Sequence, residues 1–470
     1  MTASSTEATA AHYNLRYVLF VAAVAALGGL LFGYDWVVIG GAKPFYERFF
    51  GLNSARLIGW ANSCALVGCL LGSIAAGTLG DRFGRRILLI LSAALFGISS
   101  IATGLANSFG VFVLWRITGG IAIGIASNVS PTYIAEISPA TWRGRLVALN
   151  QLMLVIGILM AQIVNWLIAE RVPAHATDLY IRQSWNGQYG WRWMFAAVAV
   201  PSAIFLLCSW FVPESPRWLA QAGKSDAARR VLQRIGGTRY GDSALQAIFA
   251  DLEHGRQSAG WHDILRAPLR GVLVAGVALA VLQQWSGINI IFNYAEEIYK
   301  RAGYSVNDIL FNIVITGSVN LAFTLISMAV VDRAGRRPLM IFGCASIAAA
   351  HGAIGVAYRL GLTGLPILIL TLCTIGFYAM SLAPVTWVLI AEIFPTKMRG
   401  RGVSLSVSAL WTASFLLTYS FPLINEALGA AGTFWLYGFI CCLGLWFVVA
   451  RVPETRGKTL EQISAGLNTA

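Results

Sequence analysis

Long apolar runs separated by short polar segments dominate this sequence. A helix of about 20 residues crosses the ~30 Å hydrocarbon core of a bilayer, because each residue adds about 1.5 Å. The runs that reach this length predict an all-α membrane protein with twelve transmembrane helices. The predicted spans cover residues 17–40, 57–79, 87–106, 111–135, 144–169, 191–212, 269–299, 308–331, 338–358, 366–391, 402–423 and 433–452.

Polar motifs at the ends of these spans occur twice, once in each half of the chain. Residues 135–145 match residues 391–401 at seven of eleven positions, and residues 81–86 and 213–215 have counterparts at 332–337 and 453–455. The repeat predicts two pseudo-symmetric six-helix bundles, joined by a helical cytoplasmic linker and followed by a cytoplasmic tail. The expected units are 1–212, 213–268 (linker), 269–452 and 453–470 (tail). Parallel repeats of this kind place a substrate site near the midplane at their interface and expose it alternately to the two sides.

The composition and the charge distribution agree with a membrane protein. Of the 470 residues, 57% are hydrophobic and 12% are charged, whereas soluble proteins carry about 25% charged residues. The net charge of +13 is compatible with nucleic-acid binding, but the basic residues form short clusters beside the spans, mostly on one side of the membrane. The positive-inside rule then predicts an inner (plasma) membrane protein with both termini in the cytoplasm. We expect no nucleic-acid partner.

Little in the sequence suggests an enzyme. The seven cysteines all fall inside predicted spans, as packing residues do. The five histidines are scattered, and no metal-ligand spacing, phosphate loop or nucleophile motif is present. Residues 1–13 lack the basic start and cleavage site of a secretory signal, so we expect the first span to be retained. We expect a monomeric carrier in the lipid bilayer, with no cofactor and no metal.

The repeated motifs combine acids with arginines at the cytoplasmic ends of the spans. A carboxylate and a guanidinium can pair bidentately across the seam between helices, and a pair that forms in only one orientation of the halves biases the conformational equilibrium. The alternative is that these residues are topogenic charges and helix ends. The candidate gating charges are Asp81, Arg85, Glu136, Arg143, Glu214, Asp332, Arg336, Glu392 and Arg399.

Two ionisable residues fall inside predicted spans. Asp35 lies in the first span and Arg116 in the fourth, each about five residues from the expected outer end, so we expect them at one depth and in contact. An acid that pairs with an arginine when deprotonated and releases it when protonated couples proton binding to helix rearrangement. The alternatives are that Asp35 caps its helix or forms a static ion pair.

A cluster of amides lies near the middle of the seventh span. Gln283, Gln284 and Asn289 stand close together in sequence, next to Ser286 and Gly287. Such groups are costly against lipid, so we expect them to face a cavity. Amides donate and accept hydrogen bonds, which suits the hydroxyls of an uncharged sugar. Gln151, Asn320, Trp387 and Trp411 complete the expected lining. Core packing is the alternative for any one of these aromatics alone.

These motifs together resemble the sugar porter family of the major facilitator superfamily. The resemblance rests on Gly33-Tyr34-Asp35, the doubled Asp-Arg-x-Gly-Arg-Arg, Pro213-Glu214-Ser215, Gln283-Gln284-x-Ser286-Gly287-Ile288-Asn289 and Pro453-Glu454-Thr455. It implies that Asp35 is the proton-coupling acid and Arg116 its partner. It further implies sugar contacts for Phe32, Gln151, Gln283, Gln284, Asn289, Asn320, Trp387 and Trp411.

The sequence therefore predicts a proton-coupled symporter for a monosaccharide, a pentose or a hexose. The chain departs from the family pattern at Ile158, Ala383, Leu410 and Asn293, so the resemblance does not specify the sugar. A facilitative sugar uniporter and a transporter-like sugar sensor are the alternatives.

Overall fold

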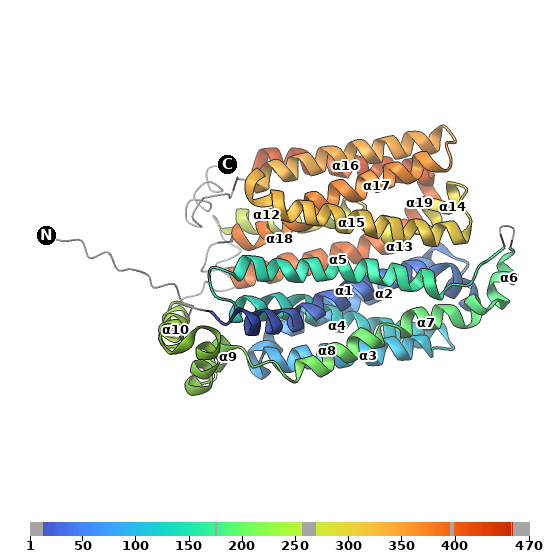
Figure 1. Ribbon diagram of the computed structural model, residues 1–470. Helices are drawn as coiled ribbons and strands as arrows, with labels where there is room; N and C mark the ends of the chain where they lie inside the picture. The colour runs from blue at the N-terminus through green and yellow to red at the C-terminus, as the bar shows by residue number, and fades with distance from the viewer. Residues whose placement is uncertain (1–12, 174–175, 256–268, 395–398, 453, 455–470) are drawn as a thin grey trace.

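The computed structural model describes residues 13–173, 176–255, 269–394, 399–452 and 454, and these form helices and no strand. The helices run roughly parallel to one axis, with the first half of the chain below and the second half above in Figure 1. Helices α9 (Pro216–Gln221) and α10 (Ser225–Gly255) lie at one end of the bundle, which we call the linker end. The other end, near α6 and α14, is called the far end.

The first half contains six crossings of the bundle. The first five are single helices, and the sixth begins with a π-helical turn, η1, and continues through α7 and α8. The bounds are α1 (Leu15–Phe50), α2 (Ala55–Phe83), α3 (Arg85–Gly104), α4 (Phe109–Ile137), α5 (Arg143–Ile168), α6 (Asp178–Gln183), η1 (Asn186–Gly190), α7 (Trp191–Ala196) and α8 (Ala199–Ser209).

The second half is built from helices with more breaks. The bounds are α12 (Leu269–Trp285), α13 (Ile288–Asn293), α14 (Ala295–Arg301), α15 (Val306–Ala334), α16 (Arg336–Arg359), α17 (Leu365–Met380), α18 (Leu382–Glu392) and α19 (Arg399–Arg451). Eleven of the described helical segments are long and apolar enough to cross a membrane.

Helix α19 accounts for two crossings. It contains 53 residues, which at about 1.5 Å each is far longer than a bilayer is thick, and its backbone is non-helical at Gly429. Trp285 at the end of α12 donates a hydrogen bond to the carbonyl of Ala413, while Leu282 packs against Gly444. The part of α19 before Gly429 therefore runs along α12 in the same direction, and the part after it returns. This confirms the predicted twelve crossings.

The seventh crossing is broken at its polar centre. Gly287 has φ 84°, a left-handed conformation that favours glycine, and it separates α12 from α13. The break frees the carbonyl of Ser286, which accepts a hydrogen bond from Nε2 of buried His351 at 2.8 Å. Irregular backbone at membrane depth is stable only where such partners are supplied.

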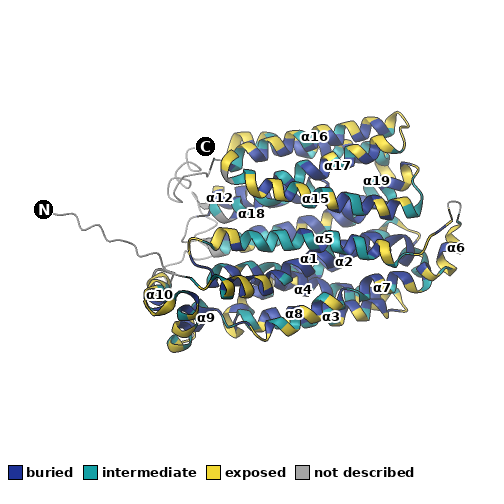
Figure 2. Ribbon diagram, in the orientation of Figure 1, coloured by how far each residue is buried: buried dark blue, intermediate teal, exposed yellow. Residues whose placement is uncertain are grey.

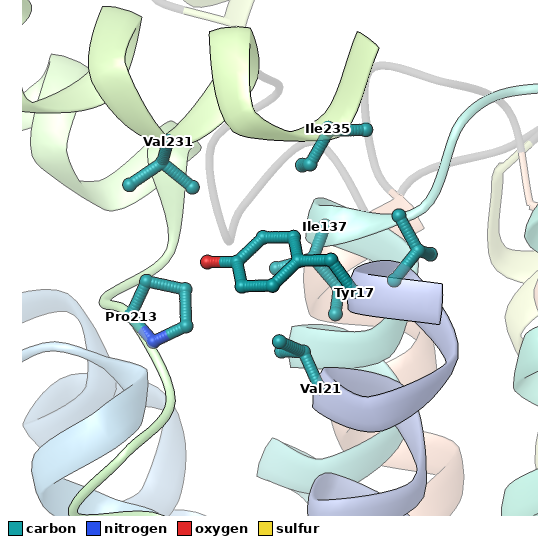
Figure 3. Close-up of a pocket in the computed structure, with 7 residues that line it drawn as sticks. Tyr17, Val21, Ile137, Pro213, Val231 and Ile235 are labelled. Carbon is teal, nitrogen blue, oxygen red and sulfur yellow. The ribbon is translucent and has the colours of Figure 1, made fainter. Parts of the chain in front are cut away.

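The linker helices dock on the end of the first half. Leu219, Ala228 and Leu232 form a small core within α9 and α10. Tyr17 of α1 points towards Pro213, between Val231 and Ile235 of α10 (Figure 3). The linker thus contacts α1 through apolar side chains, as expected for amphipathic helices below a bundle.

Burial follows the position of each helix in the bundle. Figure 2 shows dark, buried faces along α1 and α4, and yellow, exposed faces along the outer sides of α3, α8 and α16. Large apolar side chains such as Leu207, Phe211 and Trp446 are exposed on the outside. An apolar exterior over a partly polar interior is the arrangement that a bilayer favours, so the chain is a multi-pass membrane protein.

Candidate substrate and proton site

Asp35 of α1 and Arg116 of α4 form a buried ion pair. The Nη1 of Arg116 donates to Oδ1 of Asp35 at 2.9 Å, and both residues are 3% exposed. The guanidinium also lies 5.2 Å from the centre of the Phe195 ring. Asp35 Oδ2 and Arg116 Nε have no hydrogen-bond partner among the described residues. The pair thus keeps unused donor and acceptor capacity inside the bundle, and loss of either charge would leave the other buried and uncompensated.

The expected contact between Asp35 and Arg116 is confirmed, but the expected depth is wrong. Helix α1 continues to Phe50 instead of ending near residue 40, so Asp35 lies about 22 Å from its far end. Tyr46 of α1 stacks on Phe112 of α4 with ring centres 5.1 Å apart. Asp35 is therefore deeper than Arg116, and the long arginine side chain bridges the difference.

The amides of the seventh crossing lie inside the protein and not on its outer surface, and the cavity expected beside them stays a prediction. Gln283, Gln284 and Asn289 are buried. Gln284 Nε2 donates to Gln283 Oε1 at 3.0 Å, and Asn289 Nδ2 donates to Gln284 Oε1. The break at Gly287 brings the three side chains together, because a continuous helix would place residues 284 and 289 on different faces. The result is a connected set of donors and acceptors.

Aromatic rings from the two halves also meet at the interface. Phe32 and Trp36 of α1 lie 5.8 and 5.9 Å from Trp411 of α19, centre to centre. The indole N–H of Trp411 is buried, with no acceptor in the described part of the chain. Trp36 was not among the predicted residues, although it follows Asp35 directly and lies one turn beyond Phe32. Aromatic ring faces stack well on the apolar faces of sugars.

Three further residues were predicted to line the sugar site, and they lie on α5, α15 and α18. Gln151 on α5 and Trp387 on α18 are half-buried, and Asn320 on α15 is buried. Helix α5 packs directly on α15 across the two halves, where Trp166 lies 5.9 Å from Phe311. The structure joins the amides of α12 and α13 and the aromatic rings into clusters. Gln151, Asn320 and Trp387 lie on the other helices α5, α15 and α18.

At the linker end, the acids of the first half stabilise that half. Arg85 Nε lies 3.2 Å from Glu136, and Arg85 Nη1 lies 3.2 Å from Asp81. Glu214 accepts hydrogen bonds from the backbone N–H groups of Arg85 and Arg86, so it caps the beginning of α3. Burial raises the pKa of Glu214, and these donors oppose the shift.

The second half repeats this arrangement with one residue that the sequence analysis missed. Glu454 accepts from the backbone N–H groups of Arg336 and Arg337, as Glu214 does at α3. Arg336 Nη2 lies 3.5 Å from Glu392. The recurrence of Pro213-Glu214 as Pro453-Glu454 was the signal for this cap.

The described pairs of the candidate gating charges join different helices, as the motifs predict, and a role of these pairs in gating stays a prediction. The pairs Arg85–Glu136 and Arg336–Glu392 each join helices of one half, and Glu214 is bound to backbone. Arg143 is exposed. The side chains of Asp332 and Arg399 lie outside the described residues. The described pairs Arg85–Glu136 and Arg336–Glu392 thus join helix ends within one half each, which is compatible with halves that move as units.

Glu392→Gln is expected to lower the maximum transport rate roughly tenfold, which is typical of a conformational coupling of ~1.4 kcal/mol, with sugar affinity unchanged. The reason is that Gln cannot form the ion pair with Arg336. Initial rates and equilibrium binding measure the two quantities separately. Glu426→Gln, at an exposed acid of α19, is the control. A wild-type rate in the Glu392 variant would count against a role in transport.

A second charge cluster closes the far end of the interface. Lys43 of α1 contacts Glu47 of α1 at 3.0 Å and both Glu296 and Glu297 of α14, and its side chain is 1% exposed. The predicted first span ends at residue 40 and so leaves Lys43 outside it, which is wrong because α1 continues through this residue.

Arg48 extends this cluster to α6. It lies 3.1 Å from Glu296 and 2.8 Å from Asp178, and this guanidinium lowers the pKa of Asp178. The backbone of Gly40 also packs against the carbonyl of Phe292 in α13, at a distance that leaves no room for a side chain. Helix α1 of the first half is thus held against α13 and α14 of the second half at the far end.

A buried acid–arginine pair and an enclosed set of amides, inside two bundles that meet along a polar seam, define a membrane transporter rather than an enzyme. Comparison with known proteins gives the family. A family model described as "Sugar (and other) transporter" matches residues 21–467, and the chain belongs to this family.

Curated relatives and solved structures agree with this assignment. The chain is 37% identical to the D-xylose-proton symporter of Escherichia coli (strain K12), covering 96% of both chains. It is 36% identical to the arabinose-proton symporter of Bacillus subtilis (strain 168), covering 96% of this chain and 95% of that protein. The xylose transporter XylE from E. coli, in a partially occluded inward-open conformation, matches with a TM-score of 0.83 at 35% identity, covering 94% of this chain and 100% of that one.

Proposed function

We propose that this protein is a proton-coupled monosaccharide symporter that works by alternating access. The observation that carries the proposal is the buried pair of Asp35 and Arg116, which adjoins the aromatic residues that meet Trp411 across the two halves. The amides of Gln283, Gln284 and Asn289 supply donors and acceptors for sugar hydroxyls. Relatives named as sugar–proton symporters support the same activity.

The coupling step follows from the electrostatics of the pair. A deprotonated Asp35 holds the guanidinium of Arg116, and both charges are stabilised by each other inside the bundle. Protonation of Asp35 removes its charge and weakens its hold on Arg116, which changes the preferred packing of α1 on α4. Since Phe32 and Trp36 flank Asp35 on α1 and contact Trp411, the same change reaches the sugar site.

We further propose an orientation and a conformational state for the protein. The linker end faces the cytoplasm, the chain acts as a monomer in an inner membrane, and both termini are cytoplasmic. The units are 1–212, 269–452, the linker 213–268 and the tail 453–470. Closure of the far end by Lys43 and Arg48 corresponds to a state closed to the outside. Rocking of the halves then alternates access to the site.

Uptake into proteoliposomes tests the proposal. Purified protein is assayed with labelled D-xylose, D-glucose, L-arabinose and D-galactose, with and without an imposed pH gradient. We expect one or more sugars to accumulate above the external concentration only when the gradient is present. Uptake that stops at equal concentrations under the gradient would identify a uniporter. Absence of both uptake and binding for every sugar would overturn a transport role for these sugars.

A further inference from the structure

A buried amide on α5 has no assigned role and no partner. Gln162 is 1% exposed, and neither its Oε1 nor its Nε2 has a hydrogen-bond partner among the described residues. An unpaired amide inside a membrane protein costs stability, since neither water nor lipid replaces its hydrogen bonds there. A buried polar group without a protein partner calls for an explanation, such as a bound water or ion, stored strain or a functional role.

The position of Gln162 on α5 places it in line with the proposed sugar site. Gln151, Ile158 and Gln162 recur at spacings of seven and four residues, so they share one face of α5. On that face Ile158 is apolar and offers no hydrogen bond. On this face, the next polar side chain after Gln151 in the direction of the far end is therefore Gln162. It also faces the second half of the protein.

Gly317 of α15 provides the space for this amide. A Cβ atom on Gly317 would overlap Gln162 Oε1. Gly317 precedes Asn320 by three residues on the same helix, roughly 4.5 Å along its axis. The amide of Gln162 thus lies about one turn from a proposed sugar-binding residue, at the edge of the site nearer the far end.

A second buried amide, with an unpaired oxygen, lies across the seam. Asn293 of α13 is buried, and its Oδ1 has no hydrogen-bond partner in the described part of the chain. Its backbone lies beside Gly40 of α1, whose neighbour Gly41 contacts the side chain of Asn165, one turn beyond Gln162 on α5. Amides therefore lie on both sides of the interface between the two halves near Gln162, on α5 of the first half and on α13 of the second half.

We propose that Gln162 is a specificity-determining residue that hydrogen-bonds one hydroxyl of the transported monosaccharide at the far-end edge of the site. This inference rests on the proposed function. The amide can donate from Nε2 and accept at Oε1, which matches a hydroxyl group in either role. Gly317 is its positioning residue, because any side chain there displaces the amide.

The test uses the full-length protein, the best transported sugar of the uptake panel and the monodeoxy analogues of that sugar. In the wild type, removal of the hydroxyl that Gln162 contacts is expected to weaken binding roughly three- to tenfold. Gln162→Leu, which is similar in size but has no amide, is expected to bind the sugar and that one analogue equally well. Gly317→Ala, which moves the amide without removing it, is expected to reduce the same discrimination.

Asn62→Ala is the matched control. Asn62 is a buried amide whose Nδ2 donates to the Ile58 carbonyl and whose Oδ1 accepts from Tyr46. Its loss is expected to reduce the amount of folded protein and to leave discrimination among the analogues unchanged. If Gln162→Leu and Gly317→Ala transport sugar with the wild-type pattern of discrimination, the inference is wrong and the proposed function stands. If the wild type neither binds nor transports any sugar, the proposed function itself is wrong.

Discussion

Asp35→Asn is expected to move sugar across the membrane but not to accumulate it. Asparagine has nearly the same shape as aspartate but does not titrate, so proton binding no longer changes the hold on Arg116. With one proton per sugar, a gradient of about one pH unit drives roughly tenfold accumulation in the wild type, because one pH unit corresponds to a tenfold ratio. The expected ratio for Asp35→Asn is about one.

Two measurements in the same vesicles separate coupling from transport. The first is the steady-state ratio of internal to external sugar under an imposed pH gradient. The second is exchange of labelled internal for unlabelled external sugar without a gradient, which we expect Asp35→Asn to retain. Glu426→Gln, at an exposed acid outside the site, is expected to behave like the wild type in both. Accumulation by Asp35→Asn would show that another group couples the proton.

The architecture was predictable because each crossing is encoded locally by an apolar run. The break between α12 and α13 was also signalled locally, by Gly287 among amides. The far end of α1 was not predictable in this way. Lys43, Glu47 and Arg48 have the polarity of a loop, and their partners Glu296 and Asp178 lie more than a hundred residues further along the chain. Helix α1 extends there because distant carboxylates neutralise its cations.

The sequence was sufficient to propose which residues form the site, but not their depths and contacts. Charged and amide residues inside apolar runs can be recognised as candidate site residues in the sequence, since such residues are rare in membrane spans and usually face a functional interior of the protein. Their depth depends on tilt and on side-chain reach, which is why Arg116 meets an Asp35 that lies deeper than expected. Gln162 was missed because one amide in an apolar run is weak evidence until Gly317 is placed opposite it.

Lys43→Met is expected to disrupt closure of the far end. The substitution removes the cation that Glu47, Glu296 and Glu297 share, and it leaves three carboxylates close together in a buried cluster. Removing one partner from a buried ion pair typically costs about 3–5 kcal/mol. Opening of the far end separates α1 from α14 and relieves the repulsion, so the equilibrium shifts towards states open on that side. Transport then slows, because each cycle requires closure.

Distances between spin labels at Leu179 and Leu362 report this shift. Leu179 lies in α6 of the first half and Leu362 directly after α16 of the second half, and both side chains are exposed. The exposed Cys373 and Cys442 are first replaced by serine. We expect longer distances in Lys43→Met, and a return towards the wild-type distribution when Glu297→Gln is added, because Arg48 still balances Glu296. Glu297→Gln alone keeps Lys43 and two acids and is expected to change little. Wild-type distances and rates in Lys43→Met would mean that apolar packing around Gly40 closes this end without help from the charges.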